Sequence, residues 1–359
     1  MNILTSELSN QACQQESFID FTFPSSKCET SDTIAKQREK IKQEPATENS
    51  SEEVHQSEKA PQKKYVWKFI LKNVILMSGL HIISIYTIFR LPQMKMFTIL
   101  SAIVSHVLAL LGVTAGAHRL WTHRAYKAKL PLRIFLMILD CLALQNSLFD
   151  WCRDHRTHHK YSETDADPHN ACRGFFFSHM GWLLIRKHPD VAKKGRTIQI
   201  DDLMKDPVVR FQHRFYVPLA ISICFVLPSV IPWYFGGETI WNAYCMAALR
   251  YCVSLHLAWC VNSVAHMYGN RPYDRSIHPV ENLFLTWIVL GEGFHNYHHT
   301  FPHDYAASEY GMKLNLATIF IDFMALIGQA YDRRSMSKEV IEARKRRTGM
   351  YSDVQEIGW

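Results

Sequence analysis

The sequence lacks the cysteine patterns that mark disulfide scaffolds and thiolate zinc sites. Its 359 residues include nine cysteines, but no two of them form a CxxC pair. They fall in segments that we assign below to the membrane or the cytosol, whereas disulfides belong mainly to oxidising compartments. The cysteine pattern therefore argues against a disulfide framework and against a zinc-thiolate site.

Formal charge is nearly absent from three long apolar blocks, residues 69–89, 97–117 and 216–235, where Lys72 is the only charged side chain. A fourth block, residues 239–261, contains Arg250 and His256 and gives the weakest signal. About 20 apolar residues cross the hydrocarbon of a bilayer as a helix. We therefore expect four transmembrane helices in two hairpins, with Arg250 facing protein or snorkelling to the interface.

The first 60 residues lack an apolar stretch and a basic start, so we expect no cleaved signal peptide and assign the insertion signal to the first membrane helix. They hold 11 acidic and six basic residues and few aromatics, a composition typical of disorder. The expected organisation is a disordered acidic cytosolic arm over residues 1–60, a membrane domain with a cytosolic catalytic cap over 61–348, and a C-terminal tail over 349–359.

Lysine and arginine are also absent from the loop PWYFGGE, which follows the third block. Lys63, Lys64 and Lys68 precede the first block, and a basic region over residues 119–129 follows the second. The positive-inside rule therefore places both termini and the long central segment in the cytosol. Arg90 and Lys95, in the first luminal loop, are exceptions to this rule but are outnumbered.

Histidine, in contrast, is abundant, and nine of the 19 histidines gather in HRLWTH, HRTHH, HNYHH and one further position. The i, i+3, i+4 spacing of HRTHH and HNYHH predicts that each triplet offers three nitrogens to one place on a helix face. The five-residue spacing of HRLWTH, about 140° around a helix, suits two different metal ions. Neutral imidazole binds zinc, copper, iron and nickel, so this many nitrogens favours a two-metal centre without selecting the metal.

Longer motifs surround these histidines: GAHRLWTHRAYKA, WCRDHRTHHKYSETDADPHN, GFFFSHMGWLLIRKHPD, NSVAHMYGNRPYD and GEGFHNYHHTFPHDYAASEYG. Over roughly residues 65–348 they resemble the membrane-bound acyl-CoA desaturases of animals, and the insect-like stearoyl-CoA Δ9 type in particular. The resemblance implies an all-α integral membrane protein with four transmembrane helices and a cytosolic helical cap that holds a histidine-ligated dimetal site. It also implies a multi-pass location in the endoplasmic reticulum membrane, with no nucleic-acid partner.

The activity that the resemblance implies is the insertion of a cis double bond, Δ9 in position, into a saturated fatty acyl-CoA. The reaction uses dioxygen and two electrons that cytochrome b5 and its reductase deliver. Two iron ions are the implied cofactor, and the protein would hold the acyl chain and exclude side reactions. The implied iron ligands are His118, His123, His155, His158, His159, His266, His295, His298, His299 and, through a water, Asn262.

The same resemblance assigns a set of residues to coenzyme A or to the entrance of the acyl chain: Asn73, Asn146, Arg153, Asp154, Arg186, Lys187 and Trp259. Arginine and lysine are natural partners of phosphate groups. An ordinary headgroup contact is the alternative for Arg186 and Lys187.

The chain departs from the family pattern at a few positions. His106 and His256 stand where the family commonly has small or amide residues, and Cys152 replaces a small apolar residue. We expect His106 to narrow the far end of the acyl tunnel. His303 is expected beside the centre or at the surface, not as a tenth ligand, and His81, His169 and His179 are among those left outside the site.

Imidazole ligands usually donate their second ring N–H to a carboxylate or carbonyl group. The acidic residues beside the histidine motifs are therefore candidates for this role: Asp154, Glu163, Asp165, Asp167 and Glu292. The alternatives to a desaturase are a related histidine-box hydroxylase and a membrane metal-binding or transport protein. A transporter should place its ligands at the bilayer midplane, whereas these histidines fall at helix ends or in cytosolic segments.

Overall fold

The computed structural model describes residues 66–313 and 315–350. The expected acidic arm over residues 1–60 lies outside the described residues, as does most of the C-terminal tail. Within the described part, helices make up nearly all of the regular structure, and one two-stranded sheet accompanies them. The all-α prediction is confirmed.

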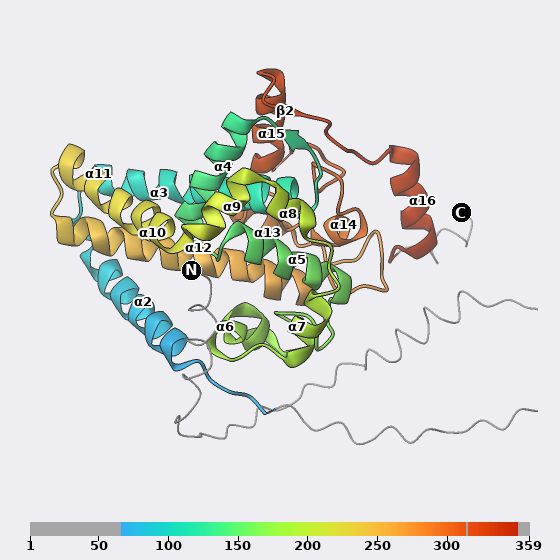
Figure 1. Ribbon diagram of the computed structural model, residues 1–359, viewed down its shortest axis with the longest axis horizontal. Coiled ribbons are helices and arrows are strands. Elements are labelled where there is room, and N and C mark those ends of the chain that lie inside the picture. Colours follow the sequence, from blue (N-terminus) through green and yellow to red (C-terminus); the bar gives the residue numbers. More distant parts are fainter. Residues whose placement is uncertain (1–65, 314, 351–359) are drawn as a thin grey trace, which may run out of the picture.

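Four helical segments are long and apolar enough to cross a membrane (Figure 1). The first joins α2 (Leu71–Arg90) to η1 (Leu91–Gln93), and the second joins α3 (Met96–Leu111) to η2 (Gly112–Thr122). The third contains α10 (Tyr216–Ile221), η5 (Ser222–Val226) and α11 (Leu227–Gly236), and the fourth is α12 (Ile240–Met267). The four predicted spans are confirmed, and an even number of crossings brings the start of α2 and the end of α12 to one side of the membrane.

α12 is the central helix of the membrane part, since it packs against α2, α3 and α11. The Thr239 hydroxyl accepts a hydrogen bond from the backbone N–H of Asn242 and so begins this helix. Arg250 is buried, and its guanidinium donates to the backbone carbonyls of Leu142 and Cys224. Arg250 therefore faces protein, one of its two expected positions, and α12 tolerates the charge because its hydrogen bonds are made internally.

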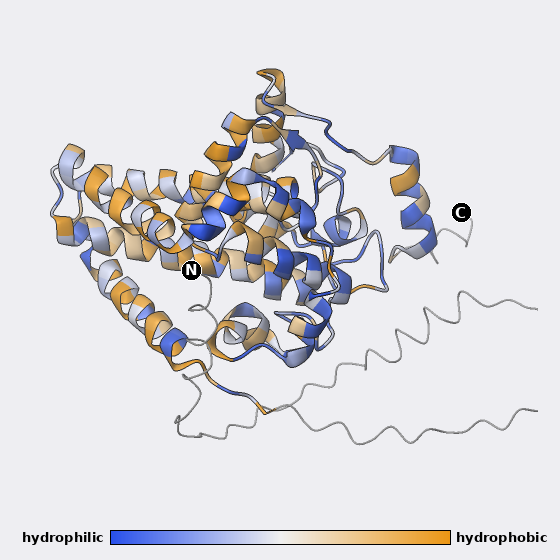
Figure 2. Ribbon diagram, in the orientation of Figure 1, coloured by the Kyte–Doolittle hydropathy of each residue, from blue (hydrophilic) through white to orange (hydrophobic). Residues whose placement is uncertain are grey.

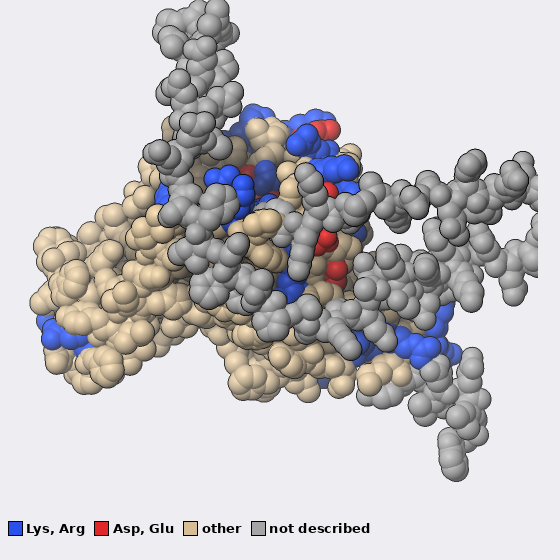
Figure 3. Space-filling model, turned by 90° about the horizontal axis from the view of Figure 1, so that it is seen from below, with Lys and Arg blue, Asp and Glu red and all other residues tan. Residues whose placement is uncertain are grey.

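α2 is the least enclosed span and exposes Ile75, Ile82, Ile85 and Phe89. In water such a surface would be costly, but it suits contact with lipid. Figure 2 shows apolar residues on the outside of the helices at this end of the molecule, and Figure 3 shows the same end almost free of charged side chains. The bilayer therefore surrounds this end.

α4 (Leu130–Ala143) and α5 (Leu148–Tyr161) form a pair bent by 80°. The bend occurs where Leu144 and Asn146 adopt positive φ angles and where the Ser147 side chain accepts from the Asp150 N–H to begin α5. A side chain at Gly112 would lie 2.3 Å from the α4 backbone, so glycine allows η2 and α4 to approach closely. The bend directs α5 under the end of η2.

The remaining elements form a polar cap at the other end of the molecule, where Lys and Arg gather (Figure 3). Antiparallel pairing of β1 (Lys127–Ala128) with β2 (Ala330–Tyr331) aligns Lys127 with Tyr331. It joins the start of α4 to the chain that follows α15 (Leu316–Leu326). The cap elements are η3 (Ala171–Arg173), η4 (Phe177–Gly181), α6 (Trp182–Leu184), α7 (Pro189–Gly195), α8 (Asp201–Lys205), α9 (Pro207–Arg214), α13 (Leu283–Ile288), α14 (His295–Thr300), α15 (Leu316–Leu326), α16 (Lys338–Thr348), β1 (Lys127–Ala128) and β2 (Ala330–Tyr331).

Candidate metal centre

The last turns of the second span are wound as a π-helix, and this winding decides where its two histidines point. The backbone N–H of His123 donates to the carbonyl of His118 at 3.1 Å, five residues back. In such a wide turn, residues five apart lie one above the other. His118 and His123 consequently join one histidine group, and the expectation that they serve two different metal ions was wrong because it assumed α-helical winding.

Nine histidines, from the end of η2 and from α5, α12 and α14, divide into two groups. Within each group, the ligand atoms lie within 4.8 Å of one another. HRTHH and HNYHH each offer three nitrogens to one locality, but each triplet is split between the two adjoining groups. Positions i and i+4 are only about 40° apart on a helix, whereas i+3 lies about 60° away on the other side. The five-histidine group is His118, His123, His155, His159 and His298, and the four-histidine group is His158, His266, His295 and His299.

The Nε2 atoms of these histidines face each other rather than other hydrogen-bonding groups. The Nε2 atom of His118 lies 2.9 Å from that of His298, and the Nε2 atoms of His266 and His295 are 3.0 Å apart. The Nε2 atom of His123 is buried without a hydrogen-bond partner. Converging nitrogens that no protein group satisfies fit the coordination of metal ions, so the residues present match a two-metal centre.

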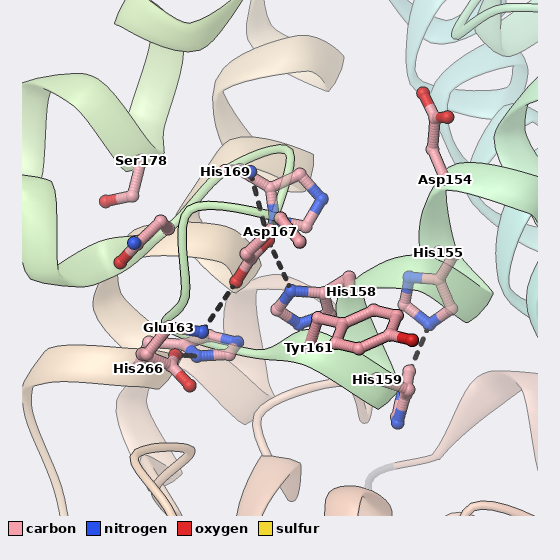
Figure 4. Close-up of polar contacts among 12 residues, drawn as sticks. Asp154, His155, His158, His159, Tyr161, Glu163, Asp167, His169, Ser178 and His266 are labelled. Atoms are coloured by element: carbon pink, nitrogen blue, oxygen red, sulfur yellow. Dashed lines mark hydrogen bonds and ion pairs between the residues drawn. The ribbon is translucent and has the colours of Figure 1, made fainter. Parts of the chain in front are cut away.

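Three largely buried carboxylates each contact the Nδ1 atom of a different histidine of the centre. Glu163 contacts Nδ1 of His266 at 2.6 Å, and Asp167 contacts Nδ1 of His158 at 3.0 Å (Figure 4). Glu292 lies 3.2 Å from Nδ1 of His118. With Nδ1 protonated toward the carboxylate, the neutral ring presents the lone pair of Nε2 to the centre.

The two other acidic candidates have different partners. Asp154 forms ion pairs with Arg153 and Lys187, and Asp165 is exposed and pairs with Arg173. Of the five carboxylates expected beside the histidine motifs, three therefore orient histidines of the groups and two do not. Figure 4 shows Asp154 directed away from the histidines of α5.

Burial and mutual repulsion keep most of these imidazoles neutral. Desolvation, followed by the charges of neighbouring histidines, lowers the pKa of His155, His159 and His299 well below the usual value. At His158, burial lowers the pKa, but the charge and hydrogen bond of Asp167 outweigh it, and the net shift is upward. Neutral rings at physiological pH leave their lone pairs available for metal ions.

Arg119 contacts a carboxylate of the centre, whereas the sequence showed it only as one of several basic residues after the second span. It is fully buried, and its guanidinium donates to Glu292 at 2.6 Å and to the side chain of Asn315 at 3.2 Å. Burial opposes ionisation of Glu292, but Arg119 and His118 hold the pKa of its carboxyl well below the usual range. The contacts reach residues almost 200 positions away, which no local pattern reveals.

Two histidines outside the predicted ligand set also lie beside the centre. His303 donates from Nδ1 to the backbone carbonyl of His123 at 2.9 Å, which fits its expected place next to the centre. His169, which the sequence analysis left outside the site, has its ring centroid 4.5 Å from that of His158. Its Nδ1 atom lies 3.5 Å from a carboxylate oxygen of Asp167. The signal that could have found it is the DADPH segment that follows HRTHH.

A cavity of about 540 Å³ reaches this centre from the boundary between the cap and the membrane helices. Its walls are mainly apolar side chains of α2, α3 and α12, and His118, His155 and His295 line one part of it. His106 also lines it, with Nδ1 2.8 Å from the hydroxyl of Ser254. Asn262, the predicted water-mediated ligand, lies in the same lining, and no direct contact to either histidine group is recorded for it among the described residues.

The residues predicted to contact the substrate meet at or near this cavity. Asn73, Asn146, Asp154 and Trp259 line it, and the Asn73 amide donates to the carbonyl of Leu183 at 2.7 Å. Lys187 and Arg153 both pair with Asp154 and thus lie next to the lining. The backbone N–H of Arg186 bonds to the carbonyl of Lys68, which brings its segment beside the start of α2.

Comparison with known proteins assigns this architecture to a family. Residues 95–311, which make up more than half of the chain, match the family described as fatty acid desaturase. The chain belongs to the fatty acid desaturase family.

Individual members of the family are similar over most of their length. Stearoyl-CoA desaturase 5 of Bos taurus is 58% identical over 281 residues, covering 78% of this chain and 84% of that protein. The human stearoyl-CoA desaturase 5 is 57% identical with coverage of 78% and 85%, and an acyl-CoA desaturase of Cyprinus carpio is 55% identical with coverage of 80% and 88%. The matched residues 95–311 include all nine histidines of the two groups.

Proposed function

We propose that this chain is an acyl-CoA desaturase that introduces a cis double bond, at the Δ9 position, into a saturated fatty acyl-CoA. The observation that carries the proposal is the junction of an apolar cavity with nine converging histidines, His118 and His295 among those in its lining. The names of the relatives, stearoyl-CoA and acyl-CoA desaturase, agree with this substrate class.

The nine histidines would hold two iron ions, with Asn262 reaching one of them through a water. Bound there, the irons supply the activation of dioxygen and the oxidising strength needed to remove two hydrogen atoms from a saturated chain. With two electrons and two protons, dioxygen leaves as two water molecules. The electrons are proposed to come from cytochrome b5 and its reductase.

The protein's own share in the reaction is to place the chain and keep the ligands in the correct tautomer. Apolar residues of α2, α3 and α12 would enclose the acyl chain, with His106 at the wall next to Ser254. Glu163, Asp167 and Glu292 hold the Nδ1–H groups of their histidines, so that each Nε2 faces the centre. The apolar lining of the cavity would restrict bulk water near the reacting carbons.

The polar end of the substrate is proposed to remain at the cap. Asn73 and Asp154 line the cavity there, and Arg153 and Lys187 pair with Asp154. The phosphate groups of coenzyme A would compete with that carboxylate for the two cations. Arg186, Asn146 and Trp259 complete the proposed contact set.

The proposed location is the membrane of the endoplasmic reticulum, with the cap and both termini in the cytosol. The charge distribution supports this orientation, because Lys and Arg gather at the cap end and are scarce around the membrane helices (Figure 3). An electron donor and an acyl-CoA from the cytosol would then reach the same face.

Expression in a desaturase-deficient yeast, followed by mapping of the double bonds in its lipids, tests the proposal. We expect monounsaturated chains with the double bond at Δ9. A product heavier by one oxygen would identify a hydroxylase, and unchanged lipids would contradict both activities.

A further inference from the structure

A second histidine cluster lies inside the membrane-spanning helices, apart from the nine-histidine centre. His81 of α2 and Cys252 and His256 of α12 bring their ligand atoms within 4.8 Å of one another. Cys252 and His256 are four residues apart and therefore share one face of α12. None of these three residues is among those that line the acyl cavity.

The hydrogen bond on the α2 side fixes the tautomer of His81. Its Nδ1 atom lies 2.6 Å from the backbone carbonyl of Met77, which can only accept. Nδ1 is therefore the protonated nitrogen of the neutral ring. The lone pair of Nε2 points at His256, whose Nε2 atom is 3.0 Å away.

A chain of hydrogen bonds on the other side fixes the tautomer of His256. The Ser263 hydroxyl donates to the carbonyl of Trp259 at 2.9 Å, so its oxygen accepts the proton of His179 Nδ1 at 3.0 Å. Nε2 of His179 then carries a lone pair and accepts from Nδ1 of His256, also at 3.0 Å. His256 is thus left with a lone pair on Nε2, directed at the lone pair of His81.

Two lone pairs facing each other at 3.0 Å repel unless a cation lies between them. We propose that His81, Cys252 and His256 form a metal site for a thiophilic d¹⁰ ion, Zn²⁺ or Cu⁺, distinct from the histidine centre of the cap. Tetrahedral zinc with bonds of about 2.0–2.1 Å to nitrogen separates two ligand nitrogens by about 3.3 Å. The observed spacing needs only a small adjustment.

The ligand set points to this class of ion. One thiolate with two imidazoles suits zinc and copper, whereas magnesium and calcium prefer oxygen. The cysteine pattern had argued against a thiolate zinc site because no two cysteines form a CxxC pair, but a site with a single thiolate needs no such pair. His179 plays the orienting role here that carboxylates play at the cap.

The site would join α2 to the rest of the membrane part. Lys72, Asn73, Leu76 and Met77 of α2 line the cavity, yet α2 is the least buried span. In Figure 1 α2 runs obliquely below α12 and diverges from it toward α6. An ion bound to His81 on one helix and to Cys252 and His256 on the other would fix this wall in place.

Metal analysis of the purified full-length protein tests the site. The protein, in detergent, is titrated with Zn²⁺ or with Cu⁺ under reducing conditions, and bound zinc, copper and iron are measured by mass spectrometry. We expect one more equivalent of zinc or copper in the wild type than in Cys252→Ala or His256→Asn, with unchanged iron content. Cys260→Ala, a half-buried thiol eight residues along α12, is the matched control and keeps the equivalent.

If the wild type and Cys252→Ala bind the same amount of zinc and of copper, the proposal is overturned. A proton shared by the two imidazoles would then explain why their Nε2 atoms face each other. Replacement by Co²⁺ gives a second readout, because thiolate coordination produces a charge-transfer absorption that histidine ligands do not. If neither variant folds, the wild-type spectrum decides, since no other histidine cluster among the described residues contains a thiol. Absence of the band in the wild type contradicts the site.

Discussion

The nine-histidine centre of the cap and the histidine cluster of the membrane helices both orient imidazole rings through Nδ1, but with partner groups of different charge. In the cap, the carboxylates of Glu163, Asp167 and Glu292 hold the Nδ1–H groups of His266, His158 and His118. In the membrane helices, the carbonyl of Met77 and the pair of His179 and Ser263 do so, and all of them are neutral. A carboxylate is costly in hydrocarbon, whereas beside two multivalent cations it compensates charge. The polarity of the surroundings thus selects the orienting group.

The largest effect is expected from removal of a histidine of the cap centre. His158→Ala or His298→Ala should abolish unsaturated product, because each removes a ligand that no neighbouring group replaces. The measurement is the fatty-acid composition of desaturase-deficient yeast that expresses each variant, with membrane insertion checked by fractionation. Full activity in either variant would contradict the ligand assignment and with it the comparison.

Substitution of Arg119 tests whether the folded protein needs a positive charge beside the cap carboxylate of Glu292. Arg119→Met leaves Glu292 buried without its cation, and loss of one partner of a buried pair costs about 3–5 kcal/mol. Arg124→Met is the matched control, since the pair of Arg124 with Asp202 is partly exposed and such pairs contribute about 0–1 kcal/mol. Thermal unfolding in detergent should separate the two variants, and equal melting temperatures would refute the role of Arg119.

A smaller effect is expected from an orienting carboxylate. Asp167→Asn keeps the shape but loses the charge that holds Nδ1–H of His158, and changes of this kind lower metal affinity or activity about 10–100-fold. Ser263→Ala, which removes an acceptor in the membrane cluster, should leave desaturation and iron content unchanged. The comparison fails if iron binding responds to Ser263→Ala and not to Asp167→Asn.

The smallest effect concerns pH and a carboxyl group beside α14. Burial raises the pKa of Glu281 to about 8, even though its carboxylate accepts from the N–H of Tyr297. Stability then falls as the pH rises from the ordinary pKa of 4.5 to the folded value, because only the unfolded state releases the proton in this range. The melting temperature of the wild type should therefore fall more between about pH 5 and pH 8 than that of Glu281→Gln. Parallel pH profiles would show that Glu281 does not titrate in this range.

The membrane spans and the gathering of nine histidines could be predicted from the sequence because both depend on local patterns. The spans depend on apolar length, and the clusters on repeated histidines within one helical turn. The grouping of His118 with His123 could not be predicted, since it depends on the π-helical winding of η2. The partners of Arg119, such as Asn315, and the meeting of His81 with His256 come from chain segments far apart in sequence.

The iron content of the purified wild-type protein tests the central claim most directly. Two histidine groups that share a cavity wall predict two irons per chain, measured by mass spectrometry against protein concentration. His123→Ala, from the five-histidine group, and His266→Ala, from the four-histidine group, should each contain fewer irons than the wild type. A wild type with no iron, or variants from both groups that retain the full wild-type iron, would contradict the account.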